Sequence, residues 1–242
     1  MRAAPPRMTE AEIDARSSAK RKQVLDFLAS GEVCSSTDVI GLLLGCSRPR
    51  AVATLGSLER DHALKSEFLL VGGRRVRLWG ITAHGLALAD RVDGAAFELG
   101  KSNPSYVPHR LDCQRLRLAA EAAGWRDWIP ERVLRGRNMR KVPDAISLDP
   151  AGHRVAVEVE RHCKTPKRYA ELMVAYLLEI KAGEVREVHF VCPAGVAALV
   201  RKCMARIVEV RHAGQRIPVE DAHRARFNYF DFSEWPPIDP AR

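Results

Sequence analysis

The sequence has no apolar run that approaches the ~18 residues typical of a membrane-spanning helix, and its first seven residues lack the hydrophobic core of a signal peptide. Its six cysteines form no CxxC pair and no recognisable spacing with the eight histidines. These absences argue against a membrane span, an exported protein, a disulfide framework and a zinc site. We therefore expect a cytoplasmic protein with no membrane partner.

The charge of the chain is unbalanced toward basic residues. Lys and Arg number 39 against 30 Asp and Glu, which gives a formal net charge of +9 over 242 residues. Such an excess favours a polyanionic partner such as DNA. With 46% apolar residues, the chain can form one large domain or two small ones with real cores.

Residues 141–167 predict a β-hairpin. Asp149, Pro150 and Gly152 occupy the positions that a type I turn with a left-handed bulge residue prefers. In that register Asp149 faces His153 across the turn. The strands on either side of the turn therefore have a defined pairing.

The hairpin register brings three carboxylates together. Asp144 is expected opposite Glu158, and Glu160 shares the face of Glu158 because side chains alternate along a strand. Opposed like charges destabilise a sheet by roughly 0.2 to 1 kcal/mol, so a cation between them is the natural explanation. We expect Mg²⁺ or Mn²⁺, which take oxygen ligands, polarise a phosphoryl oxygen and help to form hydroxide near neutral pH.

These motifs resemble the PD-(D/E)xK nuclease superfamily, whose core is a mixed sheet flanked by helices. Pro143-Asp144, Glu158-Val159-Glu160 and the basic helix that follows carry the resemblance. Together with Pro130-Glu131-Arg132, they also resemble the plasmid replication-relaxation group and MobC-type mobilization relaxases, over residues 109–193. The resemblance implies a metal held by Asp144, Glu158 and Glu160, with Glu131 as an accessory residue.

The sequence departs from the superfamily pattern at Glu160, where the superfamily would place a lysine. Either the role of that lysine passes to Lys164 or Lys167, or Glu160 itself is a ligand or base, or the site is catalytically inactive. Tyr169 is a candidate nucleophile, because one common class of relaxases attacks DNA with a tyrosine. Its place in an apolar stripe at helical spacing favours a core position instead, and the paired-histidine motif of that class is absent.

The first 90 residues predict a winged helix-turn-helix. Helices are expected over residues 20–30 and 37–44 and after Ser47, followed by strands 64–71 and 74–80 around a Gly-Gly turn. The third helix would turn Val52, Leu55 and Leu58 inward and enter the major groove of DNA. The candidate DNA-binding residues lie on this helix and on the returning strand: Arg48, Arg50, Thr54, Arg74, Arg75 and Arg77.

The turn-rich residues 91–108 predict a linker that can pack on either of two domains, the first over residues 1–90 and a restriction-endonuclease-like domain over residues 109–242. The overall class is therefore α/β (α+β). A basic loop on which a DNA strand could lie contains Arg132, Arg135, Arg137, Arg140 and Lys141, and the alternative is a run of solvated charges. The elements expected in the second domain, besides the hairpin, are a helix over 109–123, a strand over 125–134 carrying Glu131, a helix from Thr165, a strand over 187–192, a helix over 194–210 and a terminal strand near Phe227.

Three functional hypotheses are consistent with these patterns. The favoured one is a metal-dependent endonuclease that nicks double-stranded DNA at a plasmid origin-like site, as a homodimer or with conjugation or replication proteins. The second is a catalytically inactive, sequence-specific DNA-binding accessory or regulator. The third is an interaction protein that recruits a separate relaxase or coupling factor and binds DNA only weakly.

Overall fold

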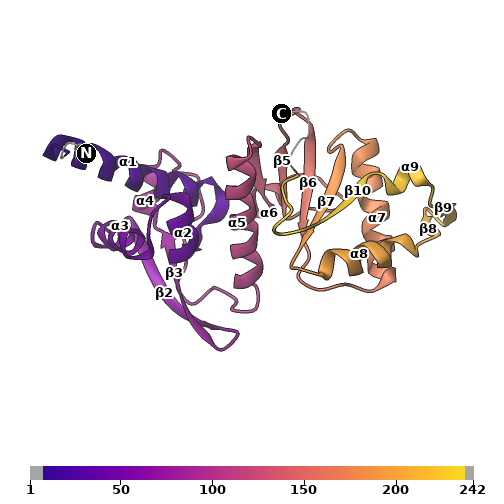
Figure 1. The fold of residues 1–242 in the computed structure, drawn as a ribbon, viewed down its shortest axis with the longest axis horizontal. Helices are drawn as coiled ribbons and strands as arrows, with labels where there is room; N and C mark the ends of the chain where they lie inside the picture. Colours follow the sequence, from indigo (N-terminus) through magenta and orange to yellow (C-terminus); the bar gives the residue numbers. More distant parts are fainter. Residues whose placement is uncertain (1–7, 238–242) are drawn as a thin grey trace, which may run out of the picture. The chain divides into compact units, whose positions relative to one another are not determined.

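The structure is a computed structural model that describes residues 8–237, and it divides into two compact units, Met1–Leu111 and Asp112–Arg242 (Figure 1). Helices and sheets are mixed in the chain, so the α+β class predicted from the sequence is confirmed. The two units are described separately.

The first unit contains an antiparallel three-stranded sheet in the order β1-β3-β2. Two residues with positive φ, Gly72 and Gly73, join the long strands β2 and β3, as a two-residue hairpin turn requires. The elements of this unit are α1 (Glu10–Phe27), a π-helical segment (Leu28–Glu32), β1 (Cys34–Ser36), α2 (Thr37–Leu43), α3 (Arg48–Arg60), β2 (Leu64–Val71), β3 (Arg74–Ile81) and α4 (Ala83–Leu88).

Helix α1 starts ten residues earlier than the expected residue 20. Thr9 and Glu12 form a reciprocal capping box, which fixes this earlier start of the helix. Helix α3 begins after Ser47 as expected, but Val52 is 40% exposed instead of inward. Ala51, Leu55 and Leu58 form the buried stripe, because successive residues of a helix turn by about 100° and Val52 falls outside that arc.

Residues 91–106 pack on the first unit. The Phe97 amide donates to the carbonyl of Ile81, and the Phe97 ring fills the space beside Gly80. A Cβ atom built on Gly80 would lie 1.9 Å from that ring. Residue 80 must therefore be glycine, because any larger side chain would collide with Phe97 of the predicted linker segment. Helix α5 (Val107–Ala122) follows it.

The second unit contains a five-stranded mixed sheet in the order β10-β7-β6-β5-β4. Strands β10, β7 and β6 are parallel to one another, whereas β5 and β4 run antiparallel to their neighbours. The elements are β4 (Arg126–Pro130), α6 (Glu131–Leu134), β5 (Ala145–Leu148), β6 (Arg154–Val159), α7 (Pro166–Lys181), β7 (Glu187–Cys192), α8 (Val196–Ala205), β8 (Glu209–His212), β9 (Gln215–Pro218), α9 (Asp221–Arg224) and β10 (Phe227–Asp231).

Helices cover both faces of this sheet (Figure 1). In one core cluster, Tyr169 and Tyr176 of α7 and Val200 of α8 pack on the face of the sheet that carries Ala156. The other joins Leu116 of α5 to the three valines of β6 and to three tryptophans. The predicted alternation of β6 is thus confirmed, with the valines on one face and Ala156 and Glu158 on the other.

Two expected elements of this unit differ in extent. The strand near Trp125 stops at Pro130, so Glu131 begins the short helix α6 and does not lie on a strand. The helix expected to reach residue 210 ends at Ala205, and a β8–β9 hairpin follows. Ala213 and Gly214, both with positive φ, make that hairpin turn.

Candidate functional site

The β5–β6 hairpin has the register that the turn residues predict. The Asp149 amide donates to the His153 carbonyl at 2.9 Å, and Gly152 has a φ of 85°. Ala145 of β5 pairs with Val157 of β6. Asp144 and Glu158, each one residue further from the hairpin turn, therefore face each other. The Val159 amide donates to Asp144 Oδ2 at 2.7 Å, which fixes this carboxylate beside β6.

Glu158 is a buried carboxylate beneath α7. Its Oε1 accepts a hydrogen bond from the Tyr176 hydroxyl and lies 2.7 Å from Lys141 Nζ. Burial, and then the nearby Asp144, raise the pKa of Glu158 to about 7, while Lys141 opposes the shift. Both contacts use Oε1, so Oε2 is the atom that can turn toward a cation.

Glu160 follows the end of β6 and is also buried. Its amide donates to the Val191 carbonyl, which holds the backbone against β7, and its Oε1 is paired with Lys164 Nζ. Burial raises the pKa of Glu160, and Lys164 lowers it. Of the two lysines considered from the sequence, Lys164 therefore reaches a site carboxylate.

Lys141 belongs to the same cluster, although the sequence places it only in a basic loop. Its ammonium group lies 2.7 Å from Glu158 Oε1 and also lowers the pKa of Glu160. Its loop is fixed by Glu179 on α7, which is 2% exposed and accepts from the Arg140 amide at 2.7 Å. The signal available in the sequence was Lys141 two residues before Pro143-Asp144.

The three carboxylates and two ammonium groups form one charged cluster, but not a closed metal cage. Asp144 interacts electrostatically with both Glu158 and Glu160. The carboxylate oxygens of the three residues do not all lie within 4.8 Å of one another. The donor set still fits Mg²⁺ or Mn²⁺, because all its atoms are hard oxygens and two of the carboxylates are buried and raised in pKa.

The other sequence candidates lie outside this cluster. Glu131 pairs with Arg135 at 2.9 Å, at the start of α6. Tyr169 is fully buried, its hydroxyl accepts from the Lys164 amide, and burial raises its pKa above the ordinary value, so it lacks the exposed oxygen that attack on DNA requires. Lys167 is exposed on the first turn of α7, and the described part of the chain gives it no ion pair.

The basic loop of the second unit is only partly available for DNA. Arg135 is held by Glu131, and Arg140 lies 3.7 Å from Glu179 with most of its side chain exposed. Arg137 is exposed. This loop also carries Lys141, so a strand that lies on it would lie next to the carboxylate cluster.

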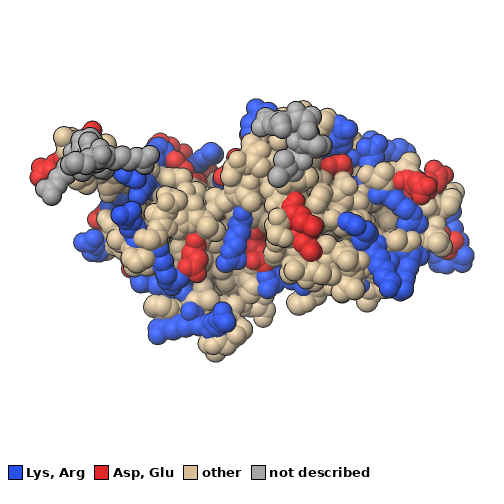
Figure 2. All heavy atoms as spheres, viewed as in Figure 1, with Lys and Arg blue, Asp and Glu red and all other residues tan. Residues whose placement is uncertain are grey.

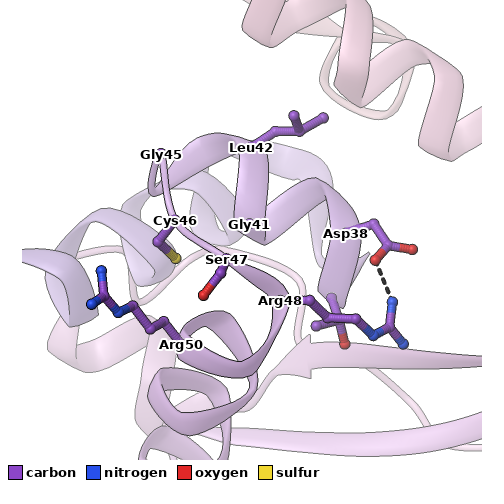
Figure 3. A pocket seen from close by; sticks show the side chains of 9 residues that line it. Asp38, Gly41, Leu42, Gly45, Cys46, Ser47, Arg48 and Arg50 are labelled. Carbon is purple, nitrogen blue, oxygen red and sulfur yellow. Dashed lines mark hydrogen bonds and ion pairs between the residues drawn. The ribbon is translucent and has the colours of Figure 1, made fainter.

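In the first unit, a hollow at the turn between α2 and α3 is lined by both candidate arginines of α3 (Figure 3). Arg48 pairs with Asp38 on α2, whereas Arg50 is exposed and points to the opposite side of the helix start (Figure 3). The Thr54 hydroxyl donates back to the Arg50 carbonyl at 3.2 Å. Arg50 is therefore the residue best placed for contact with a partner.

The arginines of β3 are not equivalent. Arg77 is half-buried, pairs with Glu59 at 2.9 Å and stacks over Trp79, so its guanidinium group is already engaged within the first unit. Arg75 stacks over Phe68 at 3.9 Å, and it and Arg74 are exposed. In Figure 2, Lys and Arg side chains gather at the tip of the β2–β3 hairpin.

The raised pKa of Glu158 predicts a pH-dependent stability. The folded chain retains a proton there that the unfolded chain loses above pH 4.5, so the free energy of unfolding should fall as the pH rises from 4.5 to about 7. The fall attributable to this group is up to roughly 3 kcal/mol. Glu158→Gln should remove this fall, which urea unfolding at several pH values in the presence of EDTA measures. The same pH dependence in wild type and variant would contradict the raised pKa of Glu158.

Comparisons with protein-family models, curated proteins and solved structures find no match to this chain. Among residues 8–237, no helix combines the length and the apolar character that crossing a bilayer requires.

Proposed function

We propose that the protein is a metal-dependent DNA endonuclease of the PD-(D/E)xK type that nicks one strand at a specific site, as plasmid mobilization and replication-relaxation proteins do. The observation that carries the proposal is the cluster of Asp144, Glu158 and Glu160 with Lys141. A buried carboxylate with a raised pKa, beside a second carboxylate and a lysine, is typical of a catalytic site and is costly as a purely structural feature.

Asp144, Glu158 and Glu160 would hold Mg²⁺ or Mn²⁺. When bound, such an ion polarises the scissile phosphate and lowers the pKa of a water molecule. The Val159 amide keeps the Asp144 carboxylate in place, and the Tyr176 hydroxyl, on α7, orients Glu158. Lys141 is positioned to stabilise negative charge that develops on a phosphate beside Glu158.

The first unit would bring the site to its DNA. The order of helices and the β2–β3 hairpin supports a winged helix-turn-helix interpretation, with α3 in the major groove and the hairpin against the backbone. Arg50, Arg74 and Arg75 are exposed on these elements and would contact DNA. Arg48 could join them only by leaving Asp38.

The direct test uses supercoiled plasmid that carries the candidate origin region, incubated with the purified protein in Mg²⁺, Mn²⁺ or EDTA. We expect open-circular product with either metal and none with EDTA. Protease treatment of the product tests for a covalent link, which the burial of Tyr169 predicts to be absent. Intact plasmid under all conditions, with a normal gel shift, would reject the endonuclease.

That outcome would favour the second candidate function, an inactive DNA-binding accessory. Its specific support is that Lys141 and Lys164 already pair with Glu158 and Glu160. Manganese titration separates the two functions, because an inactive site in which lysines permanently replace the metal would not bind Mn²⁺.

Arg50→Ala should weaken specific DNA binding by about 1 to 3 kcal/mol if the side chain reads a base edge. If it contacts a phosphate, the loss should be similar for all sequences and the salt dependence should fall by about one unit of slope. Fluorescence anisotropy at several salt concentrations measures both. Arg60→Ala, at the other end of the same helix, is the matched control. Equal losses for the two variants would contradict the assignment.

A further inference from the structure

Two cysteine thiols meet at one backbone carbonyl beside the charged cluster. Cys163 Sγ lies 3.5 Å from the carbonyl oxygen of Lys164, and Cys203 Sγ lies 3.9 Å from the same oxygen. Cys163 belongs to the connection between β6 and α7, whereas Cys203 belongs to α8. Distant parts of the sequence thus place two sulfur atoms within a short side-chain movement of each other.

The surroundings of the two thiols permit them to react. Cys163 is exposed and Cys203 is half-buried, whereas Cys34 and Cys192 are buried. The Cys203 thiol has a raised pKa, first through burial and then through the charge and hydrogen bond of Cys163, which lowers its thiolate fraction and shows that the Cys163 thiol is next to it. Cys163 is therefore the thiol that a solvent-borne reagent meets first, and Cys203 is its neighbour.

We propose that Cys163 and Cys203 form a reversible disulfide in response to a small-molecule disulfide. The Cys163 thiolate attacks one sulfur of the reagent and releases one thiol. The Cys203 thiolate then attacks Cys163 Sγ in the mixed disulfide, releases the second thiol and closes the protein disulfide. Overall the protein gives up two electrons and two protons, which the reagent takes up as two thiols.

The disulfide would lock the neighbouring lysine. Lys164 follows Cys163 directly, and its ammonium group pairs with Glu160. Tying residue 163 to α8 restricts the connection that carries Lys164, so the ammonium stays on the carboxylate that a cation would need. This consequence rests on the proposed metal site, whereas formation of the disulfide does not.

The test is oxidation of the full chain with oxidised glutathione, followed by tryptic mass spectrometry without reductant. We expect a linked pair of peptides, 162–164 with 203–206, that dithiothreitol separates. Cys163→Ser and Cys203→Ser should each abolish the link, and Cys46→Ser, in the other unit, should leave it unchanged. Absence of the linked peptide from the oxidised wild type would overturn the proposal.

A Mn²⁺ titration of the same samples tests the coupling. Oxidised wild type should bind Mn²⁺ about tenfold more weakly than reduced wild type, the effect of a constraint just outside the ligands. Cys203→Ser should show no such difference. Equal affinity in a fully linked protein would overturn the coupling, whereas no Mn²⁺ binding by the reduced protein would count against the proposed function and leave the disulfide result standing.

Discussion

Asp144→Asn is expected to reduce metal-dependent nicking by at least about 100-fold, which exceeds the usual effect of altering a residue outside the ligands. The amide retains an oxygen that can accept from the Val159 amide, so the hairpin should keep its shape, while the ligand charge is lost. Initial rates on supercoiled plasmid in Mn²⁺ measure the loss. DNA affinity should be nearly unchanged, because the candidate DNA-binding helix belongs to the other unit.

Asp149→Asn is the matched control for that experiment. Asp149 lies in the same hairpin and its Oδ1 accepts from the His153 amide at 2.7 Å, so the change is chemically identical but falls at the turn. We expect nicking close to wild type. Comparable losses in both variants would indicate that the hairpin and not a metal ligand had been damaged, and would remove the main support for the endonuclease.

Lys141→Met should reduce nicking by about 10²- to 10³-fold, the usual effect of removing one group that stabilises transition-state charge. Mn²⁺ affinity should be retained or increased, since the ammonium that competes for Glu158 is gone. Single-turnover rates at saturating Mn²⁺, with the Mn²⁺ titration, measure both effects.

Two other lysines provide the comparison. Lys164→Met should have a smaller effect, since Lys164 pairs with the peripheral Glu160, and Lys167→Met should have the least. If Lys167→Met lost the most nicking activity, the role proposed for Lys141 would be rejected. The catalytic lysine would then be Lys167, one of the two lysines that the sequence indicates.

The register of the carboxylates could be predicted because it depends on local turn chemistry. Asp149 and Gly152 determine the β5–β6 pairing, and the pairing places Asp144 opposite Glu158. Helix α7 was predictable for the same reason, from its Thr165 cap and apolar stripe. In both cases the information lies within a few residues of the feature.

Lys141 could not be assigned in this way. Its position depends on Glu179, a buried residue of α7 that binds the backbone of the preceding loop from far along the chain. The different exposure of Arg77 and Arg75 likewise depends on a tertiary contact, because Arg77 pairs with Glu59 of α3 and stacks over its strand neighbour Trp79. A run of basic residues in the sequence looks uniform, whereas tertiary contacts decide which members remain exposed.

The edge strand β10 has a consequence for synthesis of the protein. It pairs with β7 only after residues 227–231 are available, and Trp235 then donates to the buried His189 and enters the core over β6. During translation, the first unit can fold while the sheet behind the carboxylates still has an open edge. On the ribosome, the unit to which we assign DNA binding would therefore be complete before the unit to which we assign cleavage.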